Sequence, residues 1–161
     1  MADGVFNISK GFVNEYVQRI LSNDPATAEL AVHLWAGTDV TDDVMRGYET
    51  VAAIEAGILN EATFTGYAGT QPLNITDTGQ GLTQAVDHAA DNFESDFDDI
   101  TWTAAGNGAN DTLHRLTVSY DEPGTDVDAT MIPVCFYDFN VLTDGSDLTA
   151  QLDANGFFRA A

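Results

Sequence analysis

The sequence predicts a mainly β fold with a short N-terminal helix, α+β at the margin, arranged as one antiparallel β-sandwich or jelly-roll-like domain. One amphipathic segment with a helical period lies near the N-terminus, and many short strand-like segments separated by turn signals follow it. With 161 residues and 44% hydrophobic residues, the chain is long enough to build one hydrophobic core. We therefore expect a single domain over residues 1–161, with a helix over about 9–22 and a β-rich body over about 29–161.

The helix is predicted over residues 9–22. Its apolar residues recur with a helical period and form one stripe, which consists of Phe12, Val13, Tyr16, Val17, Ile20 and Leu21. Ser9 is the expected N-cap, and Pro25 follows the last turn as a stop signal. We interpret the stripe first as a core face, with a face that binds a partner as the alternative.

Residues 29–36 are predicted to form a strand with apolar side chains on both faces, which places it centrally in a sheet or under cover on both sides. Residues 37–47 are expected to form an acidic loop, and residues 48–56 a short helix that ends at Gly57. Residues 62–68 are predicted to form a strand, because Thr and aromatic residues alternate there.

Residues 82–97 fit two structures. Ala85, Val86, Ala89 and Phe93 would line one face of a helix, whereas alternation from Leu82 favours a strand. A turn is predicted just before this segment, over residues 76–81. We interpret residues 82–97 as a hairpin.

The remaining half of the chain is predicted to consist of strands and turns. Residues 131–141 contain the densest apolar run and are the best candidate for a buried strand. The other predicted strands cover residues 100–104 and 113–120, and the predicted turns cover residues 106–108, 123–124 and 144–147.

The charge balance is far from ordinary, because 26 acidic residues face five basic ones and the formal net charge is −21. Such a charge destabilises a compact state by self-repulsion, and salt screens it, since the Debye length falls from about 10 Å at 0.1 M to about 3 Å at 1 M. We interpret the acidity as adaptation to a halophilic host, with an acidic protein from an ordinary organism as the alternative. Nucleic acid and anionic membranes are not expected as partners, since both bind clusters of Lys and Arg.

No residue is assigned to catalysis, to a cofactor or to a metal. His33, His88 and His114 stand alone in the sequence and are interpreted as hydrogen-bonded strand residues. Cys135 lies in an apolar run and is interpreted as a buried structural thiol. Neither a Gly-x-Ser-x-Gly motif nor a phosphate-binding glycine loop occurs. We therefore expect a protein that is not an enzyme.

Acidic clusters at residues 42–43, 96–99 and 126–128 contain the carboxylates that Ca²⁺ and Mg²⁺ prefer. No complete EF-hand loop is present, and clusters of this kind arise by chance in a chain with 19 Asp residues. We interpret them as solvated surface, with a cation site or a glycosidase-type carboxylate pair as alternatives.

The C-terminus carries two adjacent phenylalanines, Phe157 and Phe158, followed by Arg159, where chain ends are normally polar and frayed. The favoured interpretation is that both rings close the domain's own sheet, and the alternative is that they dock into a neighbouring subunit. Together with Phe12 and Tyr16 of the helix, these three residues form the candidate interface.

The first residues lack the basic and apolar regions of a secretory signal, and no apolar run approaches the roughly 18 residues of a transmembrane helix. We therefore expect neither a signal peptide nor a membrane-spanning segment.

Several stretches taken together resemble a known class of proteins. These are residues 60–68, 100–104, 132–133 leading to 138–139, 143–147 and 156–159. In their order and spacing they are similar to small virion proteins encoded in the structural gene modules of tailed bacteriophages and archaeal tailed viruses. The resemblance covers residue 60 to the end, and the helix and the strand at 30–35 more loosely. This chain departs from phage relatives in its acidity, its scarce lysine and the pair Ala68-Gly69, where relatives place a basic residue.

The resemblance implies a virion building block assembled in the host cytoplasm, without cofactor or catalytic residues. We expect a capsid decoration or turret protein of a halophilic tailed virus, bound to the major capsid protein or other virion proteins as a symmetric homo-oligomer, a trimer or pentamer. One alternative is a tail-associated protein that contacts host surface glycans. Another is a Ca²⁺-dependent extracellular lectin or hydrolase.

Overall fold

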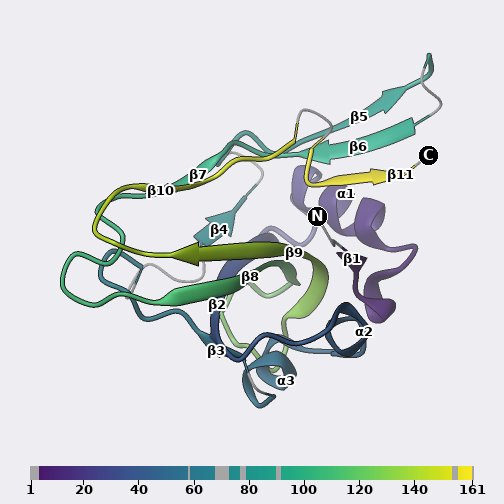
Figure 1. The fold of residues 1–161 in the computed structure, drawn as a ribbon. Helices are drawn as coiled ribbons and strands as arrows, with labels where there is room; N and C mark the ends of the chain where they lie inside the picture. Colours follow the sequence, from purple (N-terminus) through teal and green to yellow (C-terminus); the bar gives the residue numbers. More distant parts are fainter. Residues whose placement is uncertain are drawn as a thin grey trace.

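The computed structural model describes residues 4–57, 59–67, 73–76, 79–89, 92–153 and 156–160. Its largest sheet has the strand order β1-β9-β8-β2-β3, with β4 also paired to β2 (Figure 1). These strands are β1 (Gly4–Val5), β2 (Glu29–Gly37), β3 (Leu59–Glu61), β4 (Leu73–Ile75), β8 (Thr112–Asp121) and β9 (Ile132–Leu142). All of their pairings are antiparallel.

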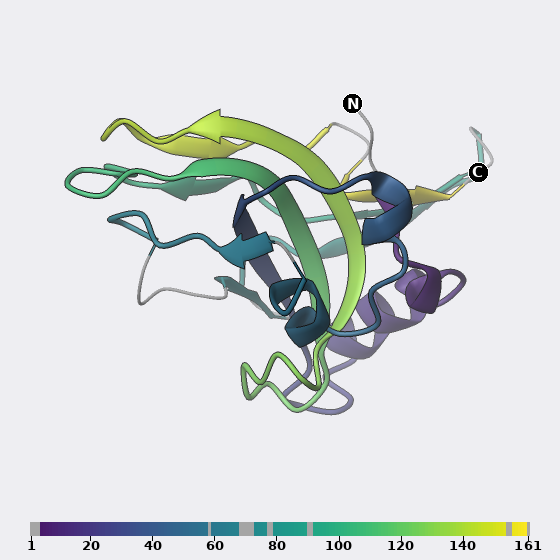
Figure 2. The ribbon, with the colours of Figure 1, turned by 60° about the horizontal axis from the view of Figure 1, so that its bottom comes forward.

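Two smaller sheets lie over one face of the large sheet (Figure 1). The first pairs β7 (Ile100–Trp102) with β10 (Leu148–Ala150), and the second has the order β11-β6-β5, from β5 (Thr83–Asp87), β6 (Asn92–Asp96) and β11 (Phe158–Ala160). The β5–β6 hairpin extends beyond the large sheet in both views (Figures 1 and 2).

Three α-helices complete the described part of the chain: α1 (Val13–Leu21), α2 (Asp42–Met45) and α3 (Val51–Glu55). A short 3₁₀ helix, η1 (Asn7–Ser9), precedes α1. Helix α1 buries Val13, Val17 and Ile20, which belong to the predicted apolar stripe. These three residues form a core face, as we interpreted the stripe first, whereas Phe12 is exposed. The predicted start at residue 9 is wrong: α1 begins at Val13, and the Ser9 hydroxyl donates to the carbonyl of Pro133 instead of capping the helix.

The large sheet is buried on both faces because its central strands carry apolar residues on both. One face packs against α1 and the two smaller sheets through Leu30, Val32, Leu34 and Val118. The opposite face packs against α2 and α3. The sheet contributes Ala31, Trp35 and Phe136 to this second core, and the two helices contribute Met45 and Ile54. Strands β8 and β9 bend along their length (Figure 2), with register shifts at Leu113/Arg115 and Val118/Ser119.

The prediction of a mainly antiparallel β fold with an N-terminal helix is confirmed. The jelly-roll-like arrangement is not confirmed, since the described strands form sheets of six, two and three strands rather than two Greek-key sheets. The central position of β2 and the hairpin within residues 82–97 follow the predictions.

The predicted strand over residues 62–68 is wrong. Strand β3 ends at Glu61, and residues 62–67 leave the sheet. The Ala62 amide still donates to Leu34 O at 2.8 Å, but the amide of Leu34 donates to the hydroxyl of Tyr67 at 3.1 Å. A tyrosine side chain thus takes the place of the next strand residue. Residue 68 lies outside the described residues.

The predicted acidic loop over residues 37–47 contains helix α2, so that prediction is wrong in part. The segment folds around a buried cation, since Arg115 of β8 contacts Asp39, Asp42 and the carbonyl of Val40. The pattern of apolar residues within 37–47 could not indicate this helix, because Arg115 lies 73 residues after Asp42 in the chain.

Candidate functional site

The N-terminal part of the candidate interface is a stack of aromatic rings. Phe12 precedes α1 with 49% of its surface exposed. Its ring stacks on Tyr16 at 6.2 Å between centroids, and Tyr16 stacks on the buried Tyr120 at 4.5 Å. The stack therefore connects an exposed aromatic ring to the core, which holds Phe12 in one place on the surface.

Helix α1 is joined to the projecting hairpin next to this ring. The amide of Gln84 on β5 donates to Asn14 Oδ1 at 2.7 Å and to the carbonyl of Asn14 at 3.1 Å. Val86, two residues further along β5, is 59% exposed, and Phe12 lies two residues before Asn14. We call these four residues, Phe12, Asn14, Gln84 and Val86, the α1/β5 face. It combines two exposed apolar side chains, Phe12 and Val86, with the hydrogen bonds that join α1 to β5.

The C-terminal part of the candidate interface closes the chain's own sheet. Phe157 is 4% exposed, its ring lies 5.0 Å from that of Phe97, and its amide donates to Ser95 O at 3.0 Å. The Phe157 ring is therefore inside its own domain, as the favoured interpretation expected, and it is not available to a neighbouring subunit. Phe158 is half-buried, and Arg159 is exposed beside Glu94 at 3.6 Å. Of these three residues, Phe158 and Arg159 keep exposed surface, and both lie on strand β11.

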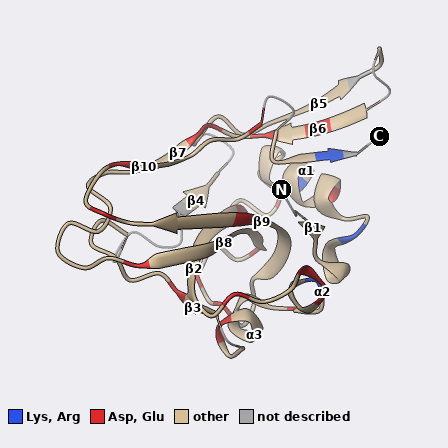
Figure 3. Cartoon of the chain, in the orientation of Figure 1, with Lys and Arg blue, Asp and Glu red and all other residues tan. Residues whose placement is uncertain are grey.

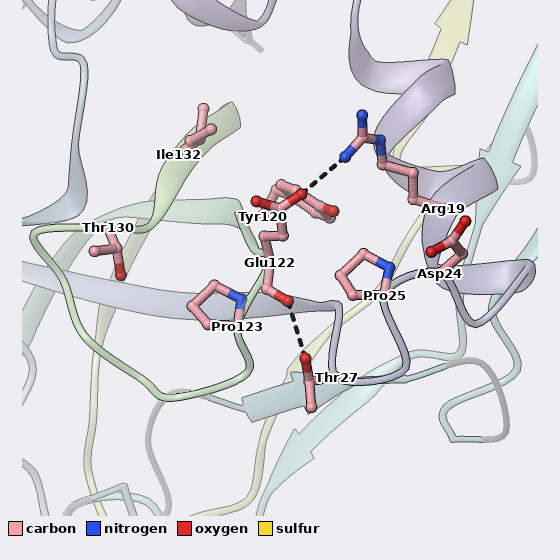
Figure 4. Close-up of a pocket in the computed structure, with 9 residues that line it drawn as sticks. All are labelled: Arg19, Asp24, Pro25, Thr27, Tyr120, Glu122, Pro123, Thr130 and Ile132. Carbon is pink, nitrogen blue, oxygen red and sulfur yellow. Dashed lines mark hydrogen bonds and ion pairs between the residues drawn. The ribbon is translucent and has the colours of Figure 1, made fainter.

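A cavity of about 780 Å³ lies between the loop after α1 and the loop after β8 (Figure 4). The basic side chain that lines this cavity, Arg19, is already paired, since it contacts both Glu122 and Glu15 at 2.8 Å. Thr27 donates to the carbonyl of Glu122 at 3.2 Å, which ties the two loops together. The residues that line this cavity offer an anion no free positive charge, and they contain no nucleophile paired with a base.

An acidic cluster lies at the end of the β2–β8 ladder, consisting of Glu29, Asp121 and Asp126. Glu29 begins β2 and Asp121 ends β8, and the two residues are direct partners in the register. The three residues each place a carboxylate oxygen within 4.8 Å of the others. Burial, together with the charges of Asp126 and Asp121, raises the pKa of Glu29 to about 7. Two buried acids, Glu29 and Asp121, therefore lie beside the exposed Asp126.

Sequence reasoning found only part of this cluster. The acidic run at residues 126–128 was singled out, but Glu29 and Asp121 were not, because they lie far apart in the sequence. The available signal was that acids occupy the first position of one predicted strand and the position just after another. Only the antiparallel register shows that those two ends meet.

The other acidic runs are held by protein groups. Asp42 pairs with Arg115 at 2.9 Å, and Asp43 with Arg46 at 3.0 Å. In the run at residues 96–99, Asp96 accepts from the amide of Phe97, and Asp99 accepts from the amide of Leu152. These carboxylates serve the local structure. The few basic residues visible in Figure 3 lie near α1, α2 and β11, while acidic residues lie on the loops and also on β6, β9 and α2.

The interpretation of the histidines as hydrogen-bonded strand residues holds for only one of them. His33 is 1% exposed on β2, and neither ring nitrogen has a hydrogen-bond partner among the described residues. Its ring stacks on Trp35 at 5.7 Å, and burial lowers its pKa to about 4. His114 lies on β8 with Nδ1 3.3 Å from Asn140 Oδ1, and His88 lies in the turn after β5. Cys135 is buried as expected.

Comparisons with protein-family models, with curated proteins and with solved structures find no match for this chain. Within the described part of the structure, no helix has the length and apolar character needed to cross a membrane.

Proposed function

We propose that this chain is a non-enzymatic structural subunit of a virion, a capsid decoration or turret protein that assembles as a symmetric homo-oligomer on the capsid of a halophilic tailed virus. The observation that carries the proposal is the projecting sheet β11-β6-β5 beside the α1/β5 face. This sheet extends past the body of the domain (Figure 1). Val86 lies on its outer strand with 59% exposure.

The outer strands of this sheet provide two different edges. Among the described residues, β5 and β11 each pair with β6 alone. An unpaired strand edge is a template for another chain, and proteins that stay monomeric usually block it with charge, proline or a bulge. Strand β5 has the sequence TQAVD, with a single charge at its end. It therefore offers little resistance to pairing.

Two different edges on one sheet suit a ring. A cyclic trimer or pentamer needs a head-to-tail interface, in which one patch of a subunit binds a different patch of the next. In the proposed assembly, the β5 edge of one copy lies against the β11 edge of its neighbour, and Val86 and Phe12 are covered. The acidity supports the same setting, since salt at molar concentration screens the repulsion between subunits of net charge −21.

Copy number in purified particles tests the proposal. Virions of a halophilic tailed virus that encodes this chain are purified on a gradient, and each protein band is quantified against the major capsid protein. Hundreds of copies per particle are expected for a capsid decoration protein. A dozen copies or fewer would place the chain in the tail, and its absence from particles would overturn the virion assignment altogether.

A further inference from the structure

We propose that Glu29, Asp121 and Asp126 bind a calcium ion, with the amide oxygen of Asn74 as a fourth protein ligand. The site goes beyond the proposed function and does not depend on it. Its residues come from four segments: the start of β2, the end of β8, the loop that follows β8, and β4. An ion at this point would fasten that loop to two strands of the large sheet.

The first argument is a buried carboxylate oxygen that lacks a donor. Asp121 has no exposed surface. Its Oδ2 accepts from the amides of Thr125 and Asp126, both at 2.8 Å, whereas its Oδ1 has no hydrogen-bond partner among the described residues. Leaving a charged oxygen without a partner in the interior is costly, and bound cations are one common way in which proteins avoid that cost. The loop thus holds Asp121 in place and leaves one oxygen available.

The second argument is that two further groups at the same place lack a partner. Glu29 is 8% exposed, and no described residue donates a hydrogen bond to its carboxylate. Asn74 donates from Nδ2 to Asp126 Oδ1 at 3.1 Å, and its own amide oxygen is buried without a donor. This hydrogen bond from the Asn74 amide holds the Asn74 side chain beside the carboxylate cluster. Acceptors converge here with no described basic side chain paired to any of them.

The third argument is size. Oxygen ligands lie 2.3–2.6 Å from Ca²⁺, so two ligands on opposite sides of the ion are about 5 Å apart. The three carboxylates place one oxygen each within 4.8 Å of one another, which is the separation that a single shared ion requires. Three carboxylates close together, two of them buried, favour a divalent ion over a monovalent one.

The donor set selects calcium among divalent ions. All four groups offer oxygen, and neither His nor Cys belongs to the cluster, so zinc and other soft-ligand metals are disfavoured. Mg²⁺ dehydrates reluctantly and usually keeps several waters, which a site built from two buried carboxylates does not favour. Ca²⁺ accepts irregular sets of side-chain oxygens and completes its shell with water at the exposed Asp126.

Isothermal calorimetry on the full chain tests the site directly, after EDTA treatment and dialysis into buffer with 2 M KCl. Calcium, magnesium and additional NaCl are titrated separately at pH 8. The titration is expected to show one calcium bound per chain and weaker binding of magnesium. A thermal scan of the same samples is expected to show a higher melting temperature with calcium. No heat with calcium, or a response that NaCl reproduces in full, would overturn the proposal.

Two variants within the cluster and one control outside it test whether any bound calcium lies at these residues. Glu29→Gln is expected to weaken calcium binding roughly tenfold or more, and Glu49→Gln, the same change at an exposed acid outside the cluster, is expected to leave it unchanged. Asp126→Asn keeps the fold, since Asp126 is exposed and has a φ of 54°, which Asn adopts readily. It should weaken binding as Glu29→Gln does. Equal affinity in all three variants would place any bound calcium elsewhere.

Discussion

Arg115 Nη1 lies 2.9 Å from Asp42 Oδ1, and this ion pair joins β8 to α2. The same guanidinium contacts Asp39 at 2.9 Å, the carbonyl of Val40 at 2.6 Å and Asp138 on β9. Only 5% of the Arg115 side chain is exposed. In a chain with five basic residues, one is thus committed to the interior, where it organises an acidic segment that would otherwise repel itself.

Replacing Arg115 with Met is expected to lower the free energy of unfolding by about 1.5–3 kcal/mol, because it removes the charged hydrogen bonds that hold three partly exposed carboxylates, Asp39, Asp42 and Asp138, close together. Urea unfolding in 2 M KCl measures the loss. The control is Arg159→Met, which removes an exposed arginine that lies 3.6 Å from Glu94 and should change the free energy by less than about 1 kcal/mol. Similar losses in both variants would contradict the structural role of Arg115.

The Tyr67 hydroxyl accepts from the Leu34 amide at 3.1 Å and donates to Glu61 Oε1 at 2.7 Å. Tyr67→Phe leaves the buried Leu34 amide without a partner, so we expect a loss of about 1–3 kcal/mol in urea unfolding. Tyr48→Phe is the matched control, since Tyr48 is half-buried and lies outside the strands. If Tyr67→Phe behaves like Tyr48→Phe, the hydroxyl does not replace a strand residue.

His33 makes stability depend on pH in a defined window. Burial lowers its pKa from 6.5 to about 4, so the folded state favours the neutral ring. The contribution of a group with a lowered folded pKa is complete above the unfolded value and is lost as the pH falls. We expect the wild type to lose of the order of 3 kcal/mol relative to His33→Leu between pH 6.5 and pH 4. Urea midpoints of both proteins across this range measure the difference, and parallel curves would contradict it.

The net charge of −21 predicts that salt stabilises the fold. The melting temperature should rise between 0.1 and 2 M KCl, with most of the increase below about 1 M, where the Debye length is already about 3 Å. NaCl at equal concentration should give a similar increase in the absence of divalent ions, since screening is not specific to one cation. A melting temperature that does not change with salt would remove the halophilic interpretation.

The strands that sequence patterning located best are those with strong apolar runs. Strands β2, β8 and β9 lie where alternation and burial predicted them, because each is longer than a typical turn-bounded segment and is covered on at least one face. The hairpin of β5 and β6 was the correct choice between two periodicities. The local sequence pattern predicts such segments correctly because the structure that it favours is also the one that tertiary packing favours.

The parts that were missed depend on contacts between distant residues. Residues 62–67 have a strand-like sequence, but the Tyr67 hydroxyl occupies the next donor on β2. Helix α2 forms where Arg115, distant in sequence, neutralises Asp39 and Asp42. The candidate cation site needs the register that brings Glu29 beside Asp121. No window of a single segment contains that information.

Sedimentation velocity in 2 M KCl tests the central claim, that this chain functions by assembly through the α1/β5 face. The wild type should sediment as a trimer or pentamer, and Val86→Asp and Phe12→Asp should sediment as monomers with unchanged circular dichroism. Leu142 is the last residue of β9, lies outside the α1/β5 face and is 66% exposed. The Leu142→Asp variant should therefore still assemble. A wild type that stays monomeric at every concentration, or a Val86→Asp variant that assembles as Leu142→Asp does, would contradict the claim.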